Sequence, residues 1–217
     1  MAISRASDSS IQDGLPKYND IWDGTTATSA FDSLGSVVPS SGTSVITFSS
    51  IPQTYTHLQI RAVVATTSSD TTVGDDSIYM RFNGDTGNNY SFHSLNGGLG
   101  AASSTTVIAK ASTSASSLNW WYAGAAWQNA NSSAGAAVST YIIDILDYTN
   151  TSKYKAVKTL FGFEANSTST NSGLLLGSGL WFKAGSGVTS DAITTISFTA
   201  ATYSFTQTTQ YALYGIK

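Results

Sequence analysis

The stretch that decides the fold is YIIDILDYTNTSKYKAVKTLFGF, residues 141–163. Two apolar runs, 138–148 and 154–163, lie on either side of the polar turn sequence TNTSK. Isoleucine, valine and aromatic residues favour a pleated surface, while Asn and Ser favour chain reversals. The stretch therefore predicts a β-hairpin.

Similar short runs, separated by turn sequences, continue through the rest of the chain after residue 44. The other predicted strands are Val45–Phe48, Thr56–Ala65, Ile78–Phe82, Tyr90–Leu95, Thr105–Ala111, Leu118–Tyr122, Leu180–Phe182, Ile193–Thr199 and Gln210–Ile216. The clearest turn is NGDTGNN (83–89), because Gly and Asn tolerate the positive φ of tight reversals. Strands at this spacing predict an all-β protein, an antiparallel β-sandwich of jelly-roll-like type.

Composition leads to the same fold class. Of the 217 residues, 64 are Ser or Thr, 11% are charged, 41% are hydrophobic, and Glu occurs only once, at Glu164. Residues that favour helices are therefore scarce, whereas Thr, Val, Ile and aromatic residues are abundant. A chain of this length buries roughly 70% of its unfolded surface, so one core is within reach without disulfide or metal staples.

Charge and cysteine content exclude several classes of function. A net charge of −3 with scattered charges makes a poor nucleic-acid binder, and the absence of cysteine excludes disulfides and thiol catalysis. We find no apolar run of membrane-spanning length, and MAISRASDSS (1–10) lacks the apolar segment of a secretion signal. We expect no membrane or nucleic-acid partner and synthesis in a cytosol.

The first 44 residues differ from the rest. They contain two of the three prolines, and their larger apolar side chains show no sustained period. These side chains are Ile11, Leu15, Ile21, Trp22 and Phe31. We expect residues 1–44 to be an extended attachment arm whose large side chains dock on a partner, with residues 45–217 forming the sandwich. The alternative is a tail with no docking role.

Asp144 is the first candidate for a site, because it lies inside an apolar run. Residues three apart on a strand point to opposite faces, so Asp144 and Asp147 do not form a carboxylate pair for acid–base chemistry. A buried charge usually needs a partner, and Lys155 and Lys158 lie on the following predicted strand. A structural ion pair is favoured over catalysis.

Metal and catalytic motifs are weak. His57 and His93 have no neighbouring ligand at metal spacing and are interpreted as hydrogen-bonded strand histidines. Four aspartates offer hard oxygen ligands for calcium, but solvated turn carboxylates are favoured; they are Asp70, Asp75, Asp76 and Asp85. No nucleophile elbow, phosphate loop or zinc-protease motif occurs. We expect that the protein is not an enzyme and that it has no catalytic residue, metal or cofactor. The distant alternative is a polysaccharide-cleaving enzyme with a sandwich fold.

Three tryptophans, Trp120, Trp121 and Trp127, lie within NWWYAGAAW (119–127). Alternation sends Trp120 and Trp121 to opposite faces of a strand, so at least one belongs to the core or to a subunit interface. The alternative is a flat aromatic platform that stacks on a sugar.

Five stretches carry a resemblance to a family of small virion proteins of tailed phages, including those that infect cyanobacteria. They are ITFSSIPQTYTHLQIRAVV (46–64), MRFNGDTGNNYSFHSL (80–95), YIIDILDYTNTSKYKAVKTLFGF (141–163), GSGLW (177–181) and QYALYGIK (210–217). The resemblance implies a β-sandwich used as an exterior module, on capsid decoration (cement) proteins or at the distal end of tail fibres and spikes, and commonly trimeric. It implies no catalytic residues, and it does not extend to the three tryptophans.

The expectation is therefore a trimeric decoration protein that binds the major capsid protein on the outer capsid surface and is synthesised in the host cytoplasm. The short length favours this role, because a fibre normally has a long shaft between anchor and tip. The alternative is a short tail fibre or receptor-binding module that recognises a host surface glycan.

Overall fold

The structure, a computed structural model of the 217-residue chain, describes residues 30–40, 42–67, 77–97, 108–118, 138–164, 172–182 and 190–217. The described residues form strands and no helix. The strands are β1 (Phe31–Val37), β2 (Val45–Phe48), β3 (His57–Val64), β4 (Ile78–Phe82), β5 (Tyr90–Gly97), β6 (Ile108–Ala115), β7 (Ser139–Leu146), β8 (Lys155–Glu164), β9 (Ser172–Trp181), β10 (Ile196–Ala200) and β11 (Gln210–Ile216).

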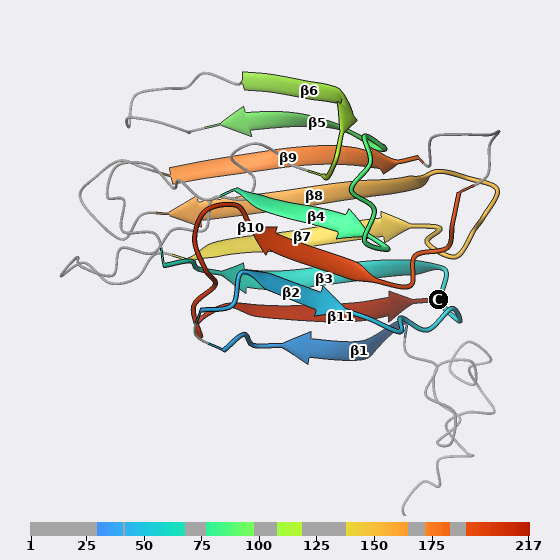
Figure 1. Cartoon of the computed structure of the whole chain (residues 1–217), viewed down its shortest axis with the longest axis horizontal. Helices are drawn as coiled ribbons and strands as arrows, with labels where there is room; N and C mark the ends of the chain where they lie inside the picture. The colour runs from blue at the N-terminus through green and yellow to red at the C-terminus, as the bar shows by residue number, and fades with distance from the viewer. Residues whose placement is uncertain are drawn as a thin grey trace, which may run out of the picture.

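The strands form two antiparallel sheets (Figure 1). The larger sheet has eight strands in the order β1-β11-β3-β7-β8-β9-β5-β6, and the smaller has three in the order β2-β10-β4. Figure 1 shows the smaller sheet in front of the middle of the larger one. The predicted all-β, antiparallel sandwich is confirmed. In the described part of the chain, no helix has the length and apolarity to cross a membrane.

The hairpin predicted at residues 141–163 is β7 and β8, which pair from Ser139↔Phe163 to Leu146↔Ala156. Alternate residues of β7, from Tyr141 to Ile145, are buried against the smaller sheet, so the period-2 pattern sets which face is the core. The turn includes Asp147 at φ +49°, a conformation that Asp tolerates better than most residues.

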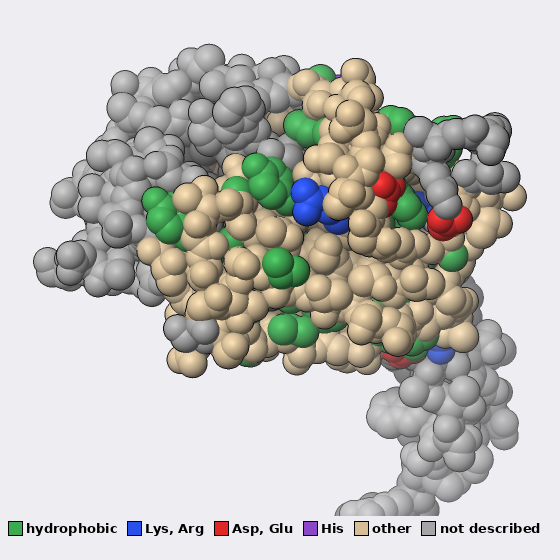
Figure 2. Space-filling view, in the orientation of Figure 1, with side chains coloured by type: hydrophobic (Ala, Val, Ile, Leu, Met, Phe, Trp, Pro, Cys, Tyr) green, Lys and Arg blue, Asp and Glu red, His purple; other side chains and the backbone are tan. Residues whose placement is uncertain are grey.

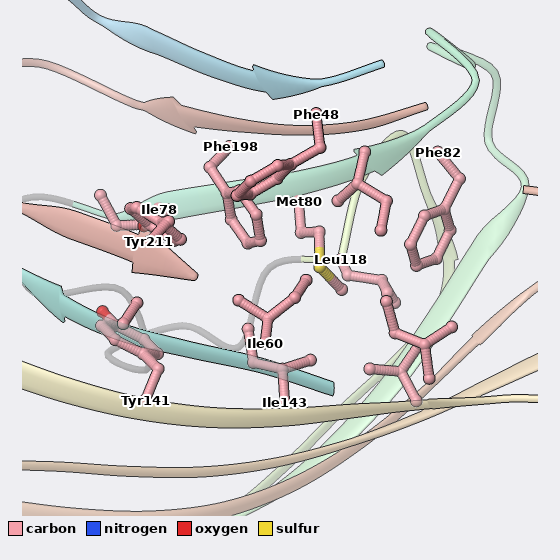
Figure 3. Close-up of a cluster of buried hydrophobic side chains, with 14 of the residues drawn as sticks. Phe48, Ile60, Ile78, Met80, Phe82, Leu118, Tyr141, Ile143, Phe198 and Tyr211 are labelled. Atoms are coloured by element: carbon pink, nitrogen blue, oxygen red, sulfur yellow. The ribbon is translucent and has the colours of Figure 1, made fainter. Parts of the chain in front are cut away.

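The core lies between the two sheets. Figure 3 shows Met80 and Phe198 of the smaller sheet directed towards Ile60 and Ile143 of the larger one, and all four side chains are almost completely buried. Phe198 also packs on Tyr211 of β11, with ring centroids 4.4 Å apart. This layer is the close-packed contact that stabilises the sandwich.

The expected boundary at residue 44 is wrong, because β1 lies inside the segment expected to be an arm. Phe31 pairs with Ile216, and β1 forms the edge of the larger sheet next to β11. A register shift between Ser33 and Gly35 breaks the period-2 pattern, which explains why the sequence pattern does not reveal this strand. The sandwich therefore begins at or before Phe31.

Other strands also differ from their predicted extents: β10 begins three residues later than predicted, and the described part of β6 begins at Ile108 and ends at Ala115, not at Ala111. The strand predicted at Leu180–Phe182 is the end of the longer β9, whose interior glycines, Gly177 and Gly179, weaken the strand signal. Of the strand predicted at Leu118–Tyr122, the structure describes only Leu118, which forms an isolated bridge with Met80.

Candidate functional site

The outer face of the larger sheet, which points away from the smaller sheet, carries a row of exposed aliphatic side chains. The antiparallel register places Ile142, Leu160, Leu176 and Leu95 directly opposite one another across β7, β8, β9 and β5. Their exposed fractions are 38%, 44%, 58% and 52%, respectively. We call these four residues the aliphatic row.

Strand alternation explains why these side chains are outside. In Leu174-Leu175-Leu176 of β9, the middle leucine is 1% exposed in the core, so its two neighbours must point outward. Leu174 is 59% exposed and lies opposite Gly162 of β8. The sheet therefore has apolar side chains on both faces, as expected of a sheet that is covered on both sides.

A second row crosses the same four strands and β3, two residues further along each strand. The strand register aligns one residue from each of β3, β7, β8, β9 and β5, namely Gln59, Asp144, Lys158, Ser178 and His93. We call these five residues the polar row. The Asp144 carboxylate accepts a hydrogen bond from Gln59 Nε2 at 2.8 Å. The two rows together give the outer face an apolar band beside a hydrogen-bonding band.

The predicted structural ion pair of Asp144 is not formed between the described residues. Lys158 lies opposite Asp144 in the register, but the carboxylate bonds to Gln59 instead. Lys155 lies on the opposite face of β8, where it is completely buried, so it cannot reach Asp144. The prediction identified the correct strand pairing but the wrong partner.

The buried Lys155 ammonium serves the turn between β7 and β8. Its Nζ donates to the carbonyl oxygen of Asn150 and, at 3.1 Å, to that of Lys153. Burial lowers the pKa of Lys155, while the negative charges of Asp147 and Asp191 oppose this shift. The ammonium thus satisfies backbone acceptors inside the hairpin, which is a structural role.

A hollow of about 660 Å³ lies on the outer face where β8, β9, β5 and β6 are adjacent. Its walls include Leu95 and Leu176 of the aliphatic row and His93, Lys158 and Ser178 of the polar row. Its volume is in the range of small-molecule pockets, and none of the described residues that line it is Phe, Tyr or Trp. The hollow can accept an apolar group and hydrogen-bond its polar end.

The histidines and the turn aspartate do not form a metal centre. His57 Nδ1 accepts the backbone N–H of Asp147 at 3.0 Å, and Lys153 Nζ lies 3.3 Å from the Asp147 carboxylate. The Asp85 carboxylate accepts hydrogen bonds from N–H groups, including Trp181 Nε1. Among the described residues, no three His or acidic side chains are grouped as metal ligands would be. Asp70, Asp75 and Asp76 lie outside the described residues.

Most of the other predicted site residues also lie outside the described residues. These are Ile11, Leu15, Ile21, Trp22, Trp120, Trp121 and Trp127. Phe31 is described: it begins β1 and is 49% exposed at the edge of the larger sheet.

The aliphatic row was not predicted from the sequence. The signal was present, because Ile142 and Leu160 alternate with core residues in the two most apolar runs of the chain. Comparison with known proteins gives no further guide: no family model matches the chain, and no curated protein and no solved structure is similar to it.

Proposed function

We propose that the protein is a structural component of a phage particle, a homotrimeric decoration protein that binds the major capsid protein on the outer capsid surface. The observation that carries the proposal is the aliphatic row on a broad, regular sheet face. Contiguous exposed apolar side chains of this kind mark protein contacts. The resemblance of five stretches to small virion proteins supports the same role.

The chemistry of the remaining surface supports an assembly role. On the side of the smaller sheet, Figure 2 shows a surface made mostly of backbone and neutral polar side chains, with few charged groups and separated apolar ones. Charged residues make up only 11% of the chain. A surface of this kind has weak long-range electrostatics, so binding would depend on shape and apolar contact more than on charge steering.

The attachment segment of this proposal is residues 1–29, which precede the described part of the chain. The sharpest test removes residues 2–29 and keeps β1 intact, because a deletion that runs into β1 would remove backbone pairing with β11. We expect the truncated protein to keep its β circular-dichroism spectrum and to lose binding to particles that lack the protein. Undiminished particle binding by the truncated protein would contradict an attachment role.

Location is tested by the copy number in purified particles, measured by quantitative mass spectrometry against the major capsid protein. A copy number comparable with that of the capsid protein is expected for a decoration protein. A number lower by more than a factor of ten, as for a tail component, would replace decoration with the tail-fibre alternative. Absence from particles would overturn both.

The hollow on the outer face is the observation that favours the tail-fibre alternative, since His93, Lys158 and Ser178 offer hydrogen-bonding groups beside leucines. In that role the protein would recognise a host glycan. A glycan array with the wild type and with Trp120→Ala, Trp121→Ala and Trp127→Ala variants tests it. Specific binding that a Trp→Ala variant loses is expected for a glycan reader; an array without signal counts against it.

A further inference from the structure

The aliphatic row and the polar row have a symmetry of their own about the line between β8 and β9. Leu160 and Leu176 lie next to this line, and Ile142 and Leu95 lie one strand further out on either side. Each half of the row therefore offers two aliphatic side chains at matching positions. A surface that matches itself in this way is what a two-fold, isologous contact requires.

We infer that a second copy of this chain covers the outer face of the larger sheet, packed face to face about a two-fold axis that runs along the strands between β8 and β9. This axis exchanges β8 with β9 and β7 with β5. Leu160 then faces the partner's Leu176, and Ile142 faces the partner's Leu95. Sheets packed face to face are about 10 Å apart, the distance at which such side chains interdigitate.

The same axis makes the polar row complementary in charge. Asp144 lies one strand out on one side of the axis and His93 one strand out on the other, so each Asp144 faces the partner's His93. Lys158 faces the partner's Ser178, and no two like charges of this row are opposed. Charged and polar groups arranged in this way fix the register of a contact and disfavour alternatives.

Leu174 and Gly162 give a third match. They are opposite one another on β9 and β8, so the axis places the partner's Leu174 over Gly162, which has no side chain of its own. A Cβ at Gly162 would make only ordinary contacts, at 3.9 Å, including those with Leu174 Cδ1 and Thr140 Oγ1 of the same chain. A large residue over a small one is the pattern of interdigitated faces. The hollow lined by His93, Leu95 and Leu176 is also filled, because the partner's β8 lies over β9 and the partner's β7 lies over β5.

An axis one strand away does not give this match. A two-fold line between β7 and β8 would set Leu176 against the partner's Arg61, which lies opposite Ile142 on β3. It would also place Leu95 against the partner's Ala212 of β11. Of these two lines, only the one between β8 and β9 sets every member of the aliphatic row against a leucine or isoleucine.

The inference rests on the proposed function in one respect: it assigns the aliphatic row to contact between copies of the chain and leaves attachment to the capsid to residues 1–29. Its test uses the purified chain without particles. A two-fold contact can coexist with a three-fold contact elsewhere on the surface. The expected change is therefore a factor of two in solution mass, measured by analytical ultracentrifugation. We expect Leu176→Glu to halve the mass of the full-length protein, and Val45→Glu, on the smaller sheet and 46% exposed, to leave it unchanged.

A charge exchange tests the two-fold pairing itself. We expect Asp144→His and His93→Asp each to raise the dissociation constant of the contact about tenfold, because each sets like groups against one another. The double variant should recover most of the loss, which mere disruption of the sheet would not do. No recovery in the double variant would overturn the proposed axis.

Cross-linking gives a test on a near-native protein, because the chain has no cysteine of its own. Leu160→Cys lies beside the axis, so a short bis-maleimide should join two copies in high yield. Val45→Cys is the control and should give only background dimer. If Leu160→Cys does not cross-link and Leu176→Glu has the mass of the wild type, the inference is wrong. The inference is also wrong if a second copy packs on this face only after residues 2–29 are removed.

Discussion

The indole of Trp181 donates a hydrogen bond to the carboxylate of Asp85 at 2.8 Å across 96 positions of sequence. The same carboxylate accepts the backbone N–H of Gly87 at 2.8 Å and Asn89 Nδ2 at 2.9 Å. Trp181 is 1% exposed in β9, and its ring lies 5.6 Å from that of Phe82. One carboxylate therefore couples the turn between β4 and β5 to the core.

Removal of this carboxylate is predicted to destabilise the whole sandwich. Asp85→Ala leaves the buried indole N–H and the turn donors without an acceptor, so the free energy of unfolding should fall by about 2–4 kcal/mol. Trp181→Phe keeps an aromatic ring and removes the N–H, so its free energy of unfolding should fall by less than that of Asp85→Ala. Urea unfolding followed by circular dichroism measures both. Fully additive losses in the double variant would contradict a direct bond between the two side chains.

Gly215 in β11 is predicted to resist any side chain. A Cβ at this position would meet the Tyr55 ring at 2.5 Å, which no side-chain adjustment at residue 215 can relieve. Gly215→Ala should therefore lower the free energy of unfolding by about 1–3 kcal/mol through overpacking. Tyr55→Ala in the same chain should remove the clash and make Gly215→Ala nearly neutral.

The control for this prediction is Gly35→Ala in β1. A Cβ there meets nothing within 4 Å, so the variant should be as stable as the wild type or slightly more stable. Equal losses of stability for Gly35→Ala and Gly215→Ala would contradict contact with Tyr55 as the cause of the effect.

The fold class could be predicted from the sequence because local patterns determine it. The run at 141–163 consists of two segments rich in β-branched and aromatic residues on either side of a polar turn, so its two strands and their turn follow from residue preferences alone. β1 and most of β9 could not be predicted in the same way. Tertiary pairing with β11 determines β1, and strong neighbours on both sides stabilise β9 despite its glycines.

The candidate site was harder to predict, because it depends on register between strands far apart in sequence. Ile142 and Leu95 look like ordinary strand residues until the strand order places them in one row. The error on Lys155 has a different, local origin. A lysine in a strand is expected at the surface, and only the backbone carbonyls of the turn explain its burial.

Lys155 leads to a prediction about pH. Burial lowers the pKa of this lysine from its ordinary value of 10.5, so the unfolded chain binds the proton more tightly than the folded one. Its contribution to stability therefore rises with pH between the folded and the unfolded pKa and is smallest below both. Lys155→Met lacks this contribution. The difference in free energy of unfolding, wild type minus Lys155→Met, should increase as the pH rises towards the ordinary lysine value of 10.5.

At pH 7 we expect Lys155→Met to be less stable than the wild type by about 1–3 kcal/mol, because the carbonyls of Asn150 and Lys153 lose their donor. Lys153→Met is the matched control. Its ammonium is exposed and should change stability by no more than about 1 kcal/mol. A difference for Lys155→Met that does not vary with pH would contradict a shifted lysine in the hairpin.

Buried tyrosines predict how the protein unfolds in alkali. Burial raises the pKa of Tyr90, Tyr148 and Tyr211 above the ordinary value of 10.0. The folded state thus holds these phenols neutral. Their contribution to stability is complete below pH 10 and is lost as the pH rises through and above that value. A pH jump to about 11.5 should ionise the exposed tyrosines at once and these three only as the sandwich unfolds. Absorbance at about 295 nm, which reports ionised phenol, and circular dichroism should therefore share one slow phase.

Tyr211→Phe keeps the ring on Phe198 and should move alkaline unfolding to higher pH, whereas Tyr154→Phe, an exposed ring, should not. If all 11 tyrosines ionise in the dead time while the β-spectrum persists, burial does not control these groups.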